Sequence, residues 1–150
     1  MFAVIRIRGD AGKRVELKST LKMLRLDAPN NCVIVPETED CKGKLQAAKD
    51  ACTWGEIDEK TFVELLKKRL RLPANKRVDE KVLKEMKIDS YEKFAKSILE
   101  GKAKMKDYNF QQNFRLTPPS KGFKSVKLPF PKGDLGYRRK EINKLLERMM

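Results

Sequence analysis

Four prolines and three glycines fall between residues 118 and 136, and together they exclude a long helix or strand from that part of the chain. Proline lacks a backbone N–H donor and fixes its own φ, and glycine favours turns over regular elements. A structureless stretch of this length is unusual inside a compact domain. Aromatic residues lie among the lysines of the same region: Tyr108, Phe110, Phe114, Phe123 and Phe130. The sequence therefore predicts that residues 103–150 form an extended, basic Pro/Gly/Lys-rich segment, which ends in a short amphipathic helix from about Arg138.

The first 57 residues carry the alternating patterns of a small mixed domain. Residues 2–8, FAVIRIR, alternate in the manner of a strand. Residues 15–26 have leucines at positions 17, 21 and 24, which is the spacing of one helix face. Three further elements complete the order: a strand over 32–35, a helix over 40–52 and a strand or turn over 53–57. This order predicts an α+β fold, a small three-stranded sheet with two helices on one face.

Residues 58–102 are predicted to be helical. Asp58, Asp79 and Ser90 each stand where they can cap a helix, and the helix after Asp58 is expected to run to about Leu70. The chain is therefore divided into three parts: a core of residues 1–57, a helical segment of residues 58–102 and the extension of residues 103–150.

Most of the excess positive charge lies in the extension. The chain has 35 Lys and Arg against 21 Asp and Glu, a net charge of +14. Residues 101–150 carry 13 basic and 4 acidic side chains, a net of +9, whereas residues 1–57 carry a net of only +2. A protein this basic usually binds a polyanion. Nucleic acid is favoured over a membrane, because no segment approaches the roughly 18 apolar residues of a membrane span, and the first residues do not read as a secretory signal.

Catalytic and metal chemistry find little support in the sequence. The chain has no histidine for acid–base work near neutral pH. Cys32, Cys41 and Cys52 are separated by eight and ten residues, a spacing that does not suit zinc. We expect them to be small hydrophobic residues in a reducing cytosol. The glycines around Lys13 lack the spacing of a phosphate-binding loop. The sequence therefore predicts no enzyme activity, metal, cofactor or small-molecule substrate.

Two groups of side chains are candidates for binding RNA. One basic stripe lies about 95° around the first helix from the leucines: Arg14, Lys18, Lys22 and Arg25. This stripe is either a row of phosphate contacts or a solvated helix face. Trp54 either stacks on a base or packs in the core. In the extension, lysines alternate with aromatic rings and suit a strand threaded between RNA helices. The complete candidate set is Arg8, Lys13, Arg14, Lys18, Lys22, Arg25, Trp54, Arg115, Lys121, Lys124, Lys127, Lys132, Arg138 and Arg139.

Several short motifs occur in an order that is itself informative. They are residues 4–8 (VIRIR) followed by Gly9, residues 20–26 (TLKMLRL), residues 53–56 (TWGE), residues 114–116 (FRL) before Pro118 and Pro119, residues 133–136 (GDLG) and residues 142–149 (INKLLERM). In this order and spacing the chain resembles the universal large-subunit ribosomal protein family numbered thirty, in its archaeal and eukaryotic long form. The resemblance runs, with gaps, from residue 2 to residue 149.

The resemblance implies an α+β core related to the ferredoxin-like layer, and a structural role on large-subunit rRNA in the cytoplasmic ribosome. It leaves open whether the small rRNA of the large subunit and neighbouring ribosomal proteins are also partners. The family often has Pro-Arg-Gly-Gly in the extension, whereas here Pro119 is followed by Ser120, Lys121 and Gly122. Two rival interpretations of the residues remain: a non-ribosomal RNA-binding protein, and a basic protein that binds a membrane surface or an acidic protein.

Overall fold

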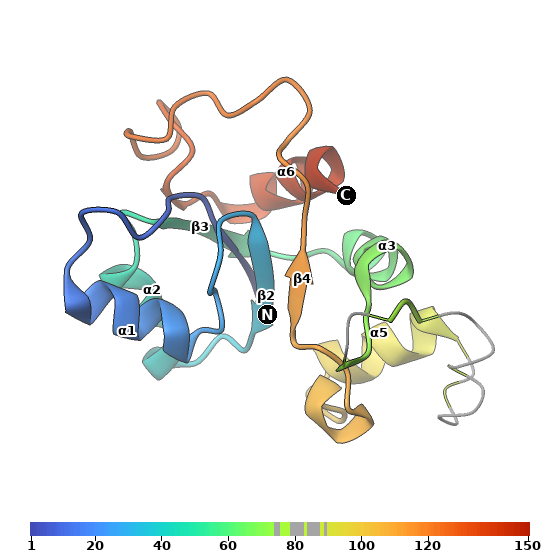
Figure 1. The fold of residues 1–150 in the computed structure, drawn as a ribbon. Helices are drawn as coiled ribbons and strands as arrows, with labels where there is room; N and C mark the ends of the chain where they lie inside the picture. Colours follow the sequence, from blue (N-terminus) through green and yellow to red (C-terminus); the bar gives the residue numbers. More distant parts are fainter. Residues whose placement is uncertain (74–75, 79–82, 84–87, 89) are drawn as a thin grey trace.

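The computed structural model of the chain is built on a five-stranded sheet in the order β4-β2-β1-β3-β5 (Figure 1). The central strand β1 (Phe2–Arg6) pairs antiparallel with both β2 (Asn31–Val35) and β3 (Cys52–Glu56). At the edges, β4 (Asn113–Arg115) adds antiparallel to β2, and β5 (Gly136–Tyr137) adds parallel to β3. The structure describes residues 1–73, 76–78, 83, 88 and 90–150.

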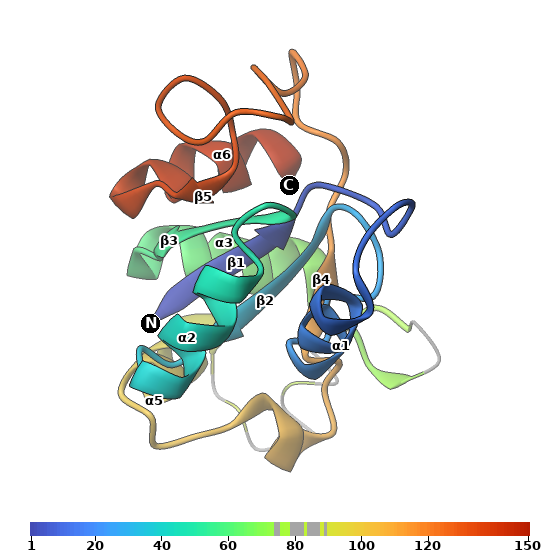
Figure 2. The same ribbon diagram turned by 90° about the vertical axis from the view of Figure 1, so that its left-hand side faces the viewer.

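Helices cover both faces of this sheet (Figure 2). On one face lie α1 (Val15–Met23) and α2 (Glu39–Ala47), and on the other lie α3 (Glu59–Arg69), α5 (Tyr91–Leu99) and α6 (Ile142–Met149). None of the helices in the described ranges is long and apolar enough to cross a membrane.

The central strand is buried on both faces, which explains its apolar sequence. Phe2 and Val4 belong to the cluster under α1 and α2, while Ala3 and Ile5 belong to the cluster under the other helices. A strand with two covered faces has no solvent side, so its side chains are almost all apolar. The exception is Arg6, which is 1 % exposed.

The predicted α+β class is confirmed, and the five elements predicted before residue 57 are all present. The sheet has two strands more than predicted, because β4 and β5 come from the segment expected to be extended. A strand of three residues and one of two are too short for alternation to reveal them.

The segment after residue 103 is more ordered than predicted. It contains the short 3-10 helices η2 (Met105–Tyr108) and η3 (Arg139–Glu141). Phe110 packs edge-on against Phe94, with ring centroids 5.6 Å apart, and Phe114 is fully buried. The irregular stretch therefore begins only after β4 and ends at β5. The larger hydrophobic cluster includes residues from all three predicted parts. The division of the chain into a core, a helical segment and an extension stays a prediction.

The predicted caps of the middle segment have different outcomes. The hydroxyl oxygen of Ser90 accepts a hydrogen bond from the Lys93 N–H at 3.3 Å and caps α5 as expected. Asp58 precedes α3, but its carboxylate accepts from the side-chain amide of Asn143 at 3.0 Å and does not cap the helix. The helix predicted to begin at Asp79 lies outside the described residues, apart from Leu83, which is buried.

Candidate nucleic-acid interface

The buried side chain of Arg6 fixes the loop between β1 and α1. Its Nη1 donates to the carbonyl oxygens of Leu26 at 2.8 Å and Asp27 at 2.9 Å. Its Nε donates to the carbonyl of Arg8 at 2.9 Å, and its Nη2 pairs with the Asp10 carboxylate at 2.6 Å. The two loops that flank α1 are thus tied to one guanidinium. An arginine among the apolar residues of the predicted strand is the sequence signal for this role.

Arg8 and Lys13, two of the predicted RNA-binding residues, meet at one backbone carbonyl. The Nη1 of Arg8 and the Nζ of Lys13 both donate to the oxygen of Asp50, each at 3.3 Å. Burial of the ammonium, and then repulsion by Arg8, lowers the pKa of Lys13. The Asp50 carboxylate opposes this shift only in part. A phosphate bound beside Arg8 and Lys13 would therefore offset their mutual repulsion.

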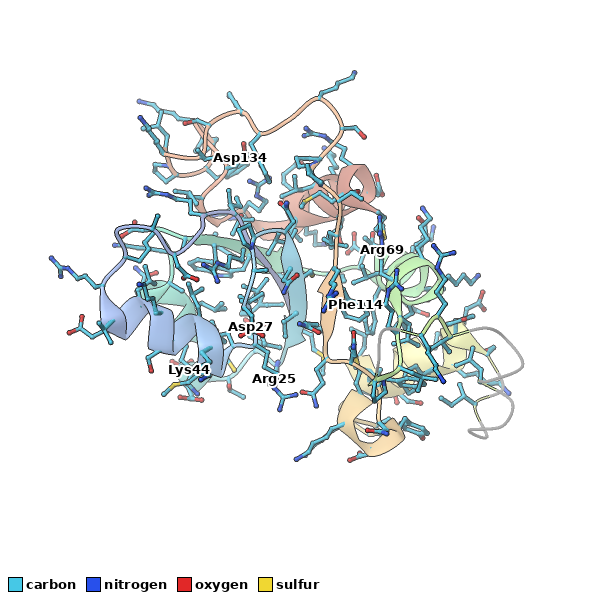
Figure 3. The ribbon with its side chains drawn as sticks, viewed as in Figure 1. Arg25, Asp27, Lys44, Arg69, Phe114 and Asp134 are labelled. Carbon is cyan, nitrogen blue, oxygen red and sulfur yellow. The ribbon has the colours of Figure 1, made fainter. Side chains whose placement is uncertain are left out.

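The basic stripe of α1 faces solvent. Arg14, Lys18, Lys22 and Arg25 are all exposed, and none of them forms an ion pair with a residue that the structure describes. Arg25 lies near the end of α1, well away from Asp134 and the loop that carries it (Figure 3). These four side chains are therefore accessible to phosphate groups, but they lie in a row along α1 and do not form one compact cluster.

The loop from β4 to β5 presents the second predicted group. Lys121, Lys124, Lys127 and Lys132 are exposed, as is Arg139 just after β5. Arg115 is also exposed, but it lies on β4, at the opposite edge of the sheet from β5. The structure therefore does not bring Arg115 together with the other members of the extension.

Two side chains outside the predicted set give this loop its shape. The Asp134 carboxylate accepts hydrogen bonds from the backbone N–H groups of Lys124 and Ser125. At the other end, Arg148 on α6 donates to the carbonyl oxygens of Ser120 at 2.7 Å and Gly122 at 2.6 Å. Asp134 is one of only four acidic residues in the last fifty, and that isolation is the signal that could have marked it.

The structure corrects the prediction for Arg138. This residue is 5 % exposed, and its Nε and Nη2 donate to groups inside the protein. Its Nη2 donates to the carboxylate and the carbonyl oxygen of Asp134, at 2.8 and 2.7 Å, and its Nε donates to the Thr53 hydroxyl at 2.8 Å. The guanidinium also lies 5.4 Å from the centroid of the Phe130 ring. Arg138 fastens β5 to β3 and is not placed to contact phosphate.

Trp54 lies in the core, in line with one of its two interpretations. It is 7 % exposed and belongs to the cluster under α1 and α2. Its ring centroid lies 6.4 Å from that of Tyr137, with the planes tilted by 32°. So little of the side chain is exposed that Trp54 cannot serve as the main stacking surface for a base.

The cysteines and acidic residues form no metal site in the described part of the chain. Cys32 and Cys52 are buried, and burial raises the pKa of both thiols to about 12. They pack as small apolar side chains, as predicted, while Cys41 is half-buried.

The acidic side chains gather elsewhere. A groove of about 960 Å³ between α3 and α6 is lined by six carboxylates and three lysines, with Lys60, Lys140 and Lys144 as the cations. Polyanions are repelled from such a groove, so this side of the molecule contrasts with the basic loops. The apolar face of α6 is buried in the core through Ile142, Leu145, Leu146 and Met149, which removes it as a membrane-binding surface.

Comparison with known proteins decides the family. The sequence model described as "Ribosomal protein L30p/L7e" matches residues 2–51. Curated relatives named "Large ribosomal subunit protein uL30" match over almost their whole length. The protein of Methanosphaera stadtmanae is 46 % identical over 152 residues, covering 100 % of both chains. That of Archaeoglobus fulgidus is 44 % identical over 151 residues, covering 99 % of both. The chain belongs to the L30p/L7e family of ribosomal proteins.

The relatives of this L30p/L7e chain support the family form that the motifs indicated. A third relative, from Nanoarchaeum equitans, is 44 % identical over 151 residues, covering 99 % of this chain and 97 % of its own. The family model ends at residue 51, before β3, whereas the relatives match through the loop from β4 to β5 and through α6. The resemblance found in the motifs is thus confirmed.

Proposed function

We propose that this protein is a structural constituent of the large ribosomal subunit, where it binds and stabilises folded large-subunit rRNA in the cytoplasm. The names of its relatives support the ribosomal role. The main structural support for RNA binding is that Arg8 and Lys13 both donate to the Asp50 carbonyl oxygen, which brings two cations together. Neighbouring ribosomal proteins, and the small rRNA of the large subunit, are further partners within this proposal.

The loops would hold rRNA mainly through phosphate contacts. Each exposed ammonium reaches a phosphate as a point charge, and each arginine can form two parallel hydrogen bonds. The loop from β4 to β5 is held in shape by Asp134 and Arg148. Binding would then lose less entropy than it would for a disordered tail. This role is one of positioning, and we assign no catalytic step to any residue.

The test compares two triple variants with equal charge changes. In the first, Lys121, Lys124 and Lys127 are replaced by Ala, and in the second, Lys60, Lys140 and Lys144 in the acidic groove are replaced by Ala. Binding to an rRNA fragment is measured across a salt series. If the protein neutralises six phosphates, the log–log slope is about −4 to −5, and loss of three contacts makes it shallower by about 2 to 3.

We expect the loop variant to lose affinity and slope, and the groove variant to keep both. A wild-type slope shallower than about −2 would refute rRNA binding through phosphates. Equal losses in the two variants would mean that only net charge matters, and not the proposed surface. Co-sedimentation with large subunits through a high-salt wash tests the ribosomal placement separately.

A further inference from the structure

We propose that a pocket at the β5 edge of the sheet binds a single unpaired RNA base, with Tyr137 as the ring on which the base stacks. This inference rests on the proposed function and adds a defined site to it. The pocket has a volume of about 350 Å³. Three segments line it: the turn after α2 with Lys49 and Asp50, the β3–β5 edge with Trp54 and Tyr137, and the loop with Lys127 and Pro129.

Tyr137 is an exposed ring that the protein holds in place. Its hydroxyl donates to the Glu56 carboxylate at 2.6 Å. Phe2 packs against it edge-on at 6.2 Å between centroids, and Trp54 lies tilted at 6.4 Å. Despite these contacts the residue remains 43 % exposed. A fixed aromatic ring with an open surface is suited to stacking, because little rotational freedom is lost when a base settles on it.

The neighbourhood of the pocket exposes other apolar side chains. The described residues include six large hydrophobic side chains that are exposed, and four of them lie within 126–137: Val126, Leu128, Phe130 and Tyr137. A group of exposed apolar side chains marks an interaction site. Here the group alternates with lysines, so its partner must offer apolar faces and negative charge together. An unpaired nucleotide offers both, through its base and its phosphate.

Several cations lie in or beside the pocket, and Asp50 is the one acidic residue among those that line it. Lys49 and Lys127 line it directly. Arg8 and Lys13 donate to the carbonyl of Asp50, another lining residue, so the pocket adjoins the phosphate site described above. Gln46 in the wall offers an amide for the edge of a base. A paired base inside a helix cannot enter a pocket of this kind, so the site would select a bulged or looped-out base.

The chain supplies its own reporter for this site. Trp54 is the only tryptophan, and it lines the pocket, so its fluorescence responds to a base that enters. We would titrate the full-length protein with two RNA hairpins that differ only by one unpaired adenine in the stem. The bulged hairpin should quench Trp54 and bind about tenfold more tightly than the fully paired one, in keeping with the usual strength of base–aromatic stacking.

Two variants of Tyr137 distinguish the contribution of the aromatic ring from that of the hydroxyl group. Tyr137→Leu should abolish the preference for the bulged hairpin, while Tyr137→Phe should retain it. Lys121→Ala, at a loop lysine outside the pocket lining, should weaken binding of both hairpins equally. Thermal unfolding of each variant checks that it is folded, and the comparison of the two hairpins on the wild-type protein needs no variant.

Each outcome has one meaning. If both hairpins bind with equal affinity and a steep salt dependence, and neither quenches Trp54, the base pocket is refuted while the proposed RNA binding stands. If neither hairpin binds, and an rRNA fragment also fails to bind, both the pocket and the proposed function are overturned. Retention of the preference in Tyr137→Leu would also refute the stacking role.

Discussion

The guanidinium of Arg138 lies 2.8 Å from the carboxylate of Asp134, four residues earlier in the chain, and both side chains are buried. The same carboxylate accepts hydrogen bonds from the N–H groups of Lys124 and Ser125. One buried ion pair therefore joins the basic loop to the sheet. Arg138, which the sequence predicts as a phosphate contact, instead holds the loop that carries Lys124 against the sheet.

Removing either partner of this pair should strongly destabilise the protein. Asp134→Ala leaves the Arg138 guanidinium buried without a counter-charge, and breaking such a pair typically costs about 3–5 kcal/mol. Urea denaturation measures the change in the free energy of unfolding. Lys132→Ala, an exposed loop change, is the control and should stay within about ±0.5 kcal/mol. A loss under about 1 kcal/mol in Asp134→Ala would show that the pair does not hold the fold together.

The sequence predicts the elements that are long enough to repeat an apolar spacing and misses the shorter ones. Five-residue strands and nine-residue helices repeat their apolar spacing, so β1 and α1 are recognisable. β5 consists of two residues, and it is held to β3 by long-range contacts such as that of the Thr53 hydroxyl, which donates to the Gly136 carbonyl at 2.9 Å across 83 residues. No local pattern encodes a contact that distant.

The sequence likewise predicts some features of the candidate site and misses others. Charge and spacing identify cations that face solvent, such as Lys18 and Lys121. They do not show which cation has a buried partner. For Arg138, only the spacing of four residues from Asp134, an otherwise isolated acid, hints that it has one. The sequence does not single out Tyr137, because its value as a stacking ring depends on how Phe2 and Glu56 hold it.

Gly55 should tolerate no side chain, because α6 and the turn before it approach the sheet there. A Cβ at Gly55 would lie 1.9 Å from the carbonyl oxygen of Arg139. Gly55→Ala should therefore destabilise the protein by at least about 2 kcal/mol, as overpacking a tight contact does. Gly43, in the exposed part of α2, is the matched control, since nothing lies within 4 Å of its Cβ position.

The control should shift stability the opposite way. Alanine is favoured over glycine inside a helix, so Gly43→Ala should stabilise the protein by about 0.5–1 kcal/mol. Thermal and urea unfolding of the two variants give both signs. Equal small effects at the two glycines would contradict the close approach of the Arg139 carbonyl to β3.

Three exposed candidate cations, Arg25, Lys121 and Arg139, occupy backbone positions that favour glycine. Arg25 has φ of 57° and Lys121 has φ of 67°, in the left-handed region that costs a non-glycine residue about 1–2 kcal/mol. Such strain persists where the side chain is needed for function. Lys121→Gly should therefore leave the stability of the free protein unchanged or raise it by up to about 1 kcal/mol, while RNA binding weakens.

Lys121→Ala separates the two effects, because it removes the charge but keeps the strained backbone. RNA affinity should fall equally in Lys121→Gly and Lys121→Ala, and the glycine variant should be the more stable of the two. Calorimetric unfolding and filter binding on the same preparations give both readings. Full RNA affinity in both variants would exclude Lys121 from the interface, and the same pair of changes at Arg25 tests the end of α1.

Bound RNA should reverse the pKa shift of Lys13. In the free protein, burial and the charge of Arg8 lower the pKa of Lys13 below its ordinary value of 10.5. The folded state thus disfavours the charged ammonium, so this residue's contribution to stability grows as the pH rises through the lowered pKa towards 10.5. A phosphate near the Asp50 carbonyl favours the charged form and should raise the pKa of Lys13.

NMR titration of the lysine side chains, with and without an rRNA fragment, measures this change in the pKa of Lys13. Lys102, whose pKa is already raised by its hydrogen bond to Glu100, serves as the reference, and it should move little. If the Lys13 pKa stays low or falls further in the complex, the phosphate does not bind beside Arg8, and the β1–α1 loop lies outside the interface.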